Sequence, residues 1–318
     1  IATQLVPIVL RFQTVATAIN FKTGIFSTAS GSATSDPRVP DTACFSGRAN
    51  VPLKVMAQSP VLNAADFNFG GTEVGTTQYG DAFQRSNFWS LIDRKNYHAD
   101  WGAGPRFTAG RHYRPCSQRL VDSRQSFRAR FLDVARKELS ISLFFEESVV
   151  TALDSLAGVN PGTLPLFMVY NTGMSFGDPT NLGNCCAGGF HSIVPVGPVM
   201  FQTYAPFDFD VSGLFLPTFN DTATASHEVA EWMNDPYIIN DTPPWGHVGQ
   251  VAGCQGNLEV GDPLSGNLAP RIFMPNGYTY DLQELVFFSW FFGAPPLGLH
   301  GWYSNNGTFL TDAGAPCK

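Results

Sequence analysis

One short segment of this 318-residue chain carries side chains spaced for metal chemistry. Residues 226–236 read SHEVAEWMNDP, within a predicted helix over residues 222–234. On a helix, His227 and Glu231 lie one turn apart on the same face, while Glu228 is turned by about 100°. Two metal ligands and a neighbouring base can be arranged in this way, as in an HExxH zinc peptidase with the second histidine replaced by glutamate.

A catalytic zinc needs a third protein ligand and one position left for water. The turn-rich segment 257–263 (NLEVGDP) offers two carboxylates, Glu259 and Asp262. Upstream, His191 lies in a glycine-rich loop just before a strand-like segment, where it could border a substrate cleft. Histidine and glutamate at helical spacing also occur on ordinary solvated faces, so the downstream carboxylates strengthen the metal interpretation.

The GFHS loop (189–192), SHEVAEWMNDP (226–236) and LEVGDPL (258–264) together resemble secreted bacterial proteins with an HExxE motif, grouped as zincin-like metallopeptidases. Their layout is also similar to that of the plant phosphate-induced EXORDIUM-like proteins. The resemblance covers roughly residues 164 to 292, and the segment 75–89 is similar in character to soil-bacterial secreted proteins.

This resemblance implies a role for each acidic or basic residue of the motifs. His227, Glu231 and Glu259 would be the metal ligands, and Glu228 would be the general base. Asp262 would support the ligands by hydrogen bonds or replace one of them. We expect Asp235 to be a supporting residue as well, and His191 to assist catalysis by stabilising an oxyanion.

The ligand set determines which ion we expect and how active it would be. Two carboxylate charges offset the +2 of a metal, so a bound water should be less acidified than on a histidine-rich site. All-oxygen coordination would favour calcium or manganese, but the imidazole of His227 makes zinc the leading choice.

A competing motif is GMSFG (173–177), which matches the GxSxG nucleophile elbow with Ser175 as nucleophile and His300 as a possible base. An elbow must lead directly into a helix, whereas the residues that follow, DPTNLG, are turn sequence. The serine-hydrolase interpretation is therefore the weaker one.

The aromatic run at residues 287–292 (FFSWFF) raises a second alternative. Exposed, it could line a groove for a polysaccharide or peptide, and the chain would be a non-catalytic binding module with a structural metal ion. So much contiguous apolar surface is a liability when exposed, so we predict a core strand instead.

Composition excludes two classes of function. Lysine and arginine number 19 against 26 acidic residues, so the net charge of -7 gives no reason to expect nucleic-acid binding. No stretch approaches the roughly 20 apolar residues that a membrane-spanning helix needs. The 44% hydrophobic content, with 31 glycines and 23 prolines, describes an ordered, loop-rich chain.

The cysteines and the first residue favour secretion. Six is an even number, and no CxxC zinc pair is present, so disulfides in an oxidising compartment are expected. The chain starts at Ile1 without an initiator methionine, which is typical of a mature product. The cysteines are Cys44, Cys116, Cys185, Cys186, Cys254 and Cys317.

The elements expected around the motif define an α+β fold. Apolar runs predict strands at residues 7–12, 164–170 and 193–204, and helical spacing predicts helices at residues 81–92 and 123–156. We expect a β-rich N-terminal segment over residues 1–120, and a zincin-like domain over residues 121–318 with a mixed sheet and the active-site helix.

The sequence thus predicts a secreted, disulfide-bonded metallopeptidase with zinc as its cofactor. Its expected partner is a peptide or protein substrate, with an extracellular polymer as the partner in the binding-module alternative.

Overall fold

The chain divides into two compact units, each made of two separate stretches of sequence. Unit 1 comprises Ile1–Lys54 and Arg114–Leu216, and unit 2 comprises Val55–Tyr113 and Pro217–Lys318. The computed structural model describes residues 2–8, 10–13, 16–20, 25–29, 32–41, 51–92, 159–175, 185–211, 215, 219–312 and 317. The predicted boundary at residue 120 and the predicted helix over residues 123–156 lie outside these residues.

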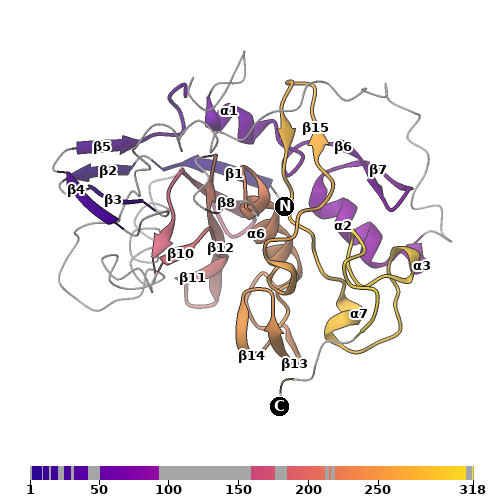
Figure 1. Ribbon diagram of the computed structural model, residues 1–318. Helices are drawn as coiled ribbons and strands as arrows, with labels where there is room; N and C mark the ends of the chain where they lie inside the picture. Colours follow the sequence, from indigo (N-terminus) through magenta and orange to yellow (C-terminus); the bar gives the residue numbers. More distant parts are fainter. Residues whose placement is uncertain are drawn as a thin grey trace. The chain divides into compact units, whose positions relative to one another are not determined.

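Unit 1 is organised around a mixed four-stranded sheet in the order β1-β8-β12-β11 (Figure 1). The bounds are β1 (Ala2–Pro7), β8 (Thr163–Tyr170), β11 (Ser192–Gly197) and β12 (Met200–Phe209). β8 pairs parallel with both β1 and β12 and is buried from Leu164 onward, as its continuous apolar sequence predicts for a central parallel strand. The predicted strand at residues 164–170 is confirmed.

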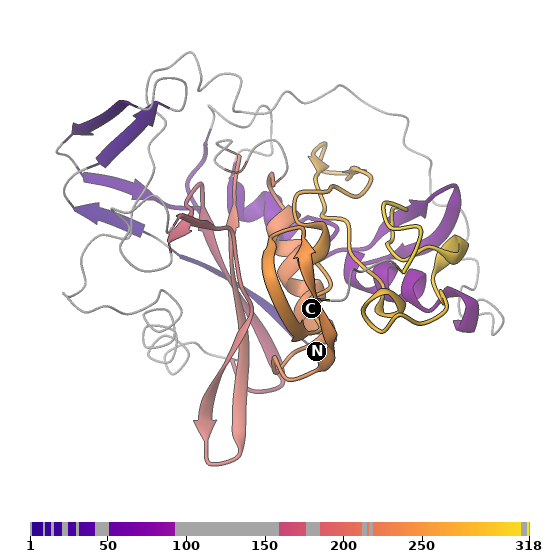
Figure 2. The same cartoon turned by 60° about the horizontal axis from the view of Figure 1, so that its bottom comes forward.

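The strand-like segment predicted at residues 193–204 forms a hairpin rather than one strand. The first half of β12 pairs antiparallel with β11, and its second half, from Ala205, pairs with β8. The hairpin, drawn in salmon in Figure 2, therefore extends past the ends of β1 and β8. Proline and glycine at residues 197–198 provide the turn that the prediction overlooked.

The remaining described strands of unit 1 form two-stranded pairs. β2 (Leu10–Gln13) pairs with β5 (Ser32–Ser35), β3 (Ala16–Asn20) with β4 (Ile25–Ala29), and β9 (Met174–Ser175) with β10 (Cys185–Ala187). The described part of residues 1–41 thus contains strands and no helix. With the helices of unit 2, the chain is mixed α/β, consistent with the predicted α+β class.

In its described residues, unit 2 combines short helices with three hairpins. The strand pairs are β6 (Ala65–Phe69) with β7 (Thr72–Thr77), β13 (Asp241–Val248) with β14 (Val251–Asn257), and β15 (Ile272–Phe273) with β16 (Thr279–Tyr280). The helices are α1 (Pro52–Ala57, which contains the unit boundary), α2 (Tyr79–Asn87), α3 (Trp89–Ile92), α6 (Ala223–Asn234), η3 (Asp262–Leu264), α7 (Phe288–Phe291) and η4 (Leu299–Gly301). Among the described residues, no helix has the length and apolar character to cross a membrane.

Residues 287–292 belong to the core for the most part, as predicted, but the predicted strand is wrong, because this segment forms the single-turn helix α7 (Phe288–Phe291). Its rings pack at helical rather than alternating positions. Trp290 and Phe291 are both buried against Trp245, and Trp290 also stacks on Phe309. Phe292 at the end of the turn stays about half exposed, at 48%.

One disulfide closes unit 2 near the C-terminus. It joins Cys254 in β14 to Cys317, 63 residues later. Cys44 and Cys116 lie outside the described residues, and Cys185 and Cys186 are described only as part of β10.

The helix that carries the predicted metal ligands is confirmed as α6. It packs closely against α2, since a Cβ on Gly80 would lie 2.4 Å from the sulfur of Met233. Gln84 of α2 also donates a hydrogen bond to Asn234 at the end of α6. Ten of the twelve residues of α6 are buried, so its polar side chains must find partners inside the protein.

A buried pair of carboxylates holds the start of α6. The backbone N–H of Asp281 donates to Asp221 at 3.0 Å, and the hydroxyl of Thr222 donates to the carbonyl of Asp281 at 2.7 Å. Tyr278 also donates to Asp221, and Arg271 pairs with Asp281. Burial, followed by the negative charge of Asp281, raises the pKa of Asp221 to about 8.

This raised pKa predicts a loss of stability with increasing pH. The folded chain keeps a proton on Asp221 that the unfolded chain, with a pKa of 3.8, releases. The stabilisation is complete below the unfolded value and is lost as pH rises to about 8. Asp221→Asn should remove this part of the pH dependence, and asparagine tolerates the positive φ of 36° found here.

The measurement is urea unfolding of both proteins between about pH 5 and pH 9, a window that brackets most of the expected loss. The free energy of unfolding should fall more steeply with pH in the wild type than in Asp221→Asn. Asp241→Asn, which changes an exposed carboxylate in β13, serves as the control and should follow the wild type. Parallel curves for wild type and Asp221→Asn would contradict the assignment.

Candidate metal centre

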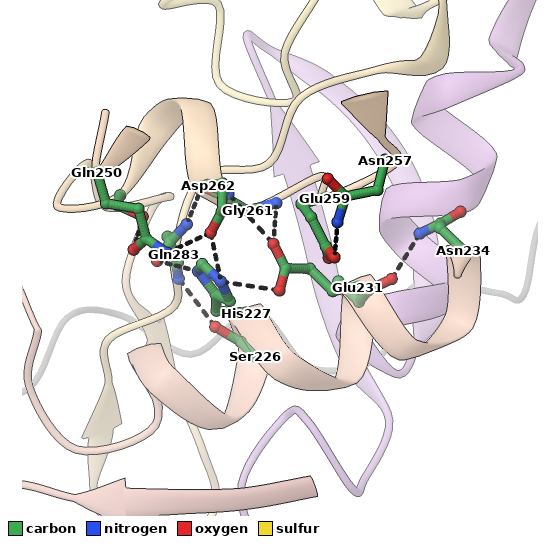
Figure 3. Close-up of polar contacts among 12 residues, drawn as sticks. Ser226, His227, Glu231, Asn234, Gln250, Asn257, Glu259, Gly261, Asp262 and Gln283 are labelled. Atoms are coloured by element: carbon green, nitrogen blue, oxygen red, sulfur yellow. Dashed lines mark hydrogen bonds and ion pairs between the residues drawn. The ribbon is translucent and has the colours of Figure 1, made fainter. Parts of the chain in front are cut away.

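α6 brings the two predicted ligands of the helix motif into direct contact. His227 and Glu231 lie one turn apart, and the imidazole Nε2 is 3.0 Å from Oε2 of Glu231 (Figure 3). Both side chains are buried, with relative exposures of 6% and 5%. The helical spacing in the sequence therefore places a nitrogen and an oxygen ligand at the same point inside unit 2.

The third member of this cluster is Asp262, the first residue of η3. Its Oδ1 lies 3.4 Å from Nε2 of His227. One ligand atom from each of His227, Glu231 and Asp262 lies within 4.8 Å of the others, which is close enough to hold one metal ion. The cluster thus contains Asp262, the carboxylate that the sequence interpretation placed as a supporting or alternative ligand.

Glu259, expected as the third ligand, is not a member of this three-residue cluster. It is buried, and its Oε1 accepts a hydrogen bond from the side-chain amide of Asn257. The difference arises from the turn between Glu259 and Asp262, which the spacing of two carboxylates in a loop does not define. The backbone at Gly261 and Asp262 faces Glu231, and this brings the side chain of Asp262 to His227.

Glu231 connects the turn at residues 259–262 to α6 by hydrogen bonds. Its Oε1 accepts hydrogen bonds from the backbone N–H groups of Gly261 at 3.1 Å and Asp262 at 3.2 Å. Its other oxygen, Oε2, faces His227. One carboxylate therefore positions the loop ligand and also contributes an oxygen to the cluster.

Two glutamines from the β13–β14 hairpin orient Asp262. Gln250, in the turn between the strands, donates to Oδ1, and Gln255 of β14 donates to Oδ2 at 3.1 Å. Ser265 in turn donates to Gln250 at 2.6 Å. Both oxygens of Asp262 are therefore held by amide donors, as is usual for a carboxylate that supports or ligates a metal.

Gln283 provides a further contact on the other side of the imidazole. Its Oε1 lies 2.8 Å from Nδ1 of His227, and its Nε2 donates to the carbonyl of Gly261 at 2.7 Å (Figure 3). The sequence analysis missed Gln250, Gln255 and Gln283, because an amide side chain belongs to no metal-binding motif. Proximity is a sequence signal for two of them, since Gln250 and Gln255 both come shortly before the segment 257–263 that contains Asp262; Gln283 has no such signal.

The charges of the cluster require a positive partner. Burial lowers the pKa of His227, but the carboxylates of Glu231 and Asp262 outweigh burial and raise that pKa well above its ordinary value. Burial and the charge of Glu231 raise the pKa of Asp262. The cluster thus favours a bound positive charge, which a proton or a metal cation can supply.

The other predicted site residues belong to three different segments of the chain. Glu228 is buried on α6, and its charge also raises the pKa of His227. Asp235 follows α6 and accepts hydrogen bonds from the backbone of Ile239 and Asn240, so it shapes the turn after the helix. His191 belongs to unit 1, where it is buried directly before β11.

The residues of the competing motifs belong to other elements of the chain. Ser175 lies in the short strand β9, and the residues directly after it are outside the described part of the chain. His300 of unit 2 contacts the hydroxyl of Thr72 at 3.2 Å and packs on Trp302. His247 lies close to Cys254 and Cys317, but the disulfide between these cysteines leaves no thiolate to bind a metal.

Comparisons with protein-family models, with curated proteins and with solved structures find no match to this chain.

The imidazole of His227 packs directly on the backbone of Gly261. A Cβ at this position would lie 2.5 Å from Nδ1 of His227, although the backbone angles of Gly261, φ -90° and ψ -36°, suit any residue. Gly261→Ala should therefore displace the imidazole without straining the main chain. We expect a loss of about 1–3 kcal/mol in the free energy of unfolding, the usual cost of overpacking.

Gly253→Ala is the matched control, because a Cβ at Gly253 would meet nothing within 4 Å. Urea unfolding of both variants gives the stability, and metal titration of the same samples tests whether the displaced imidazole weakens binding. Equal stability of Gly261→Ala and Gly253→Ala would show that His227 does not occupy this position.

Proposed function

We propose that this chain is a secreted metal-dependent hydrolase of zincin-like fold that cleaves peptide bonds with a zinc ion held by His227, Glu231 and Asp262. The observation that carries the proposal is the convergence of Nε2 of His227 with the buried carboxylates of Glu231 and Asp262. The ligand set keeps the sequence-based pair on α6 and replaces Glu259 by Asp262.

The donor set fits zinc. One imidazole nitrogen and two carboxylate oxygens are common zinc ligands, and three protein ligands leave one position for water or substrate. Neutral His227 with ionised Glu231 and Asp262 carries two negative charges, which a divalent ion balances. The nitrogen ligand disfavours calcium and magnesium, which bind oxygen.

Glu228 is the residue of this chain that we assign to proton transfer. It adjoins His227 on α6 and lies about 100° around the helix from it, so it can act beside the ligands without being one of them. A zinc ion, when bound, supplies Lewis acidity and an acidified water. Glu228 then accepts a proton from the attacking water and donates it to the leaving amine.

Two features support the wider assignment. The disulfide between Cys254 and Cys317 is typical of proteins in oxidising compartments, which supports secretion. The mixed sheet of unit 1 and the ligand helix of unit 2 are the elements that a zincin-like fold requires. A peptide or protein substrate is the partner that this chemistry implies.

The burial of the ligands favours one alternative, a structural ion in a secreted binding module for a cell-wall or other extracellular polymer. His227, Glu231 and Asp262 are all less than 10% exposed, and closed sites are typical of structural metals. Glu228 separates the two functions, since a structural ion needs no neighbouring base.

Two isosteric substitutions on one helix test the proposal. The wild type should bind about one zinc ion per chain and hydrolyse labelled casein in a metal-dependent reaction. Glu228→Gln should keep the zinc and lose at least about 100-fold in hydrolysis, because it removes the general base. Glu231→Gln should lose the zinc itself. Metal content by mass spectrometry and initial rates are the measurements.

Three outcomes would contradict the proposal of a metal-dependent hydrolase. If the wild type binds no metal, metal-dependent hydrolysis is excluded. If it binds zinc but cleaves nothing, the structural-ion alternative is indicated. Hydrolysis that survives chelation but is lost in Ser175→Ala would instead indicate a serine hydrolase. Circular dichroism of each variant controls for folding.

A further inference from the structure

Gln283 is fixed by a contact at every polar atom it has. Its backbone N–H donates to the hydroxyl of Ser226 at 2.9 Å, and its carbonyl accepts a hydrogen bond from Tyr79. Its side-chain Oε1 lies 2.8 Å from Nδ1 of His227, and its Nε2 donates to Gly261. The residue is fully buried, so its amide is held in one place and has no freedom to exchange partners with solvent.

The orientation of this amide follows from the chemistry of its neighbours. The backbone carbonyl of Gly261 can only accept a hydrogen bond, so the atom of Gln283 that lies 2.7 Å from it must be the NH₂ group. The amide oxygen of Gln283 must then be the atom that faces His227. An amide oxygen can only accept, so Nδ1 of His227 must carry a proton and donate it.

We infer that Gln283 is a positioning residue that makes Nε2 the metal-binding atom of His227. With the proton held on Nδ1, the lone pair of the neutral imidazole is on Nε2. That nitrogen faces Oε2 of Glu231 at 3.0 Å and Oδ1 of Asp262 at 3.4 Å. A lone pair directed at two carboxylates is unfavourable unless a proton or a metal cation lies between them. The inference rests on the proposed metal site and names the residue that orients its nitrogen ligand.

The same amide joins the two parts of the site. Through Oε1 it contacts the ligand helix, and through Nε2 it contacts the carbonyl of Gly261, next to Asp262. The contact between the backbone N–H of Gln283 and Ser226 sets its register one residue before His227. Gln283 therefore fixes the ring orientation of His227 relative to the loop that carries Asp262, which reduces the reorganisation needed to bind an ion.

The test replaces the amide with an apolar side chain of similar length. Gln283→Met should weaken zinc binding about 10- to 100-fold, the usual cost of removing a hydrogen-bond partner of a ligating histidine. Gln202→Met is the matched control, because Gln202 is also a fully buried glutamine whose amide donates to backbone carbonyls, but it belongs to unit 1. Zinc dissociation constants come from competition with a chromophoric chelator, and circular dichroism confirms the fold.

Gln283→Glu tests the acceptor specifically, since its carboxylate can still accept the proton of Nδ1 but cannot donate to Gly261. It should bind zinc more tightly than Gln283→Met. Equal affinities for wild type and Gln283→Met, or for Gln283→Met and Gln283→Glu, would overturn the inference while leaving the proposed metal site intact.

A measurement on the wild type keeps the inference testable where the variants fail to fold. A long-range ¹H–¹⁵N correlation spectrum of the zinc-loaded protein distinguishes the two ring nitrogens of His227. Metal on Nε2 with a proton on Nδ1 supports the role of Gln283, and metal on Nδ1 overturns it. A wild type that takes up no zinc overturns the proposed function, and this inference with it.

Discussion

The approach of two buried carboxylates to one imidazole is the constraint around which unit 2 is built. Isolated charges inside a protein are costly unless they are hydrogen-bonded and neutralised. Glu231 and Asp262 meet the first requirement through two backbone N–H groups and two glutamines. Their negative charge is neutralised by a proton or a cation, which the closeness of both carboxylates to His227 favours.

Several features far apart in the sequence follow from this constraint. Asp262 needs donors, and the β13–β14 hairpin supplies them, while the disulfide at Cys254 anchors the hairpin next to Gln255. His227 needs room, which Gly261 leaves by having no Cβ. The junction of Asp221 and Asp281 connects the start of α6 to the segment that continues to Gln283. These contacts together hold His227, Glu231 and Asp262 in their positions.

The sequence predicted the parts of this arrangement that depend on local spacing. Helical periodicity located α6, and an apolar run between breakers located β8. The grouping of Asp262, rather than Glu259, with His227 and Glu231 was not predictable, because it depends on the direction of a turn whose hydrogen-bond partner, Glu231, belongs to another element. The aromatic run at α7 was interpreted as a strand because a short apolar segment has no period that separates strand from helix.

The burial of Glu228 is the strongest physical reason to favour the hydrolase over a purely structural ion. Glu231 and Asp262 already balance a divalent cation, so Glu228, a second acid on α6, adds negative charge that the cluster does not need. Placing Glu228 at 4% exposure costs free energy, and a buried acid next to a proposed metal ligand is typical of a general base. The position of this glutamate therefore links the architecture of α6 to the proposed chemistry.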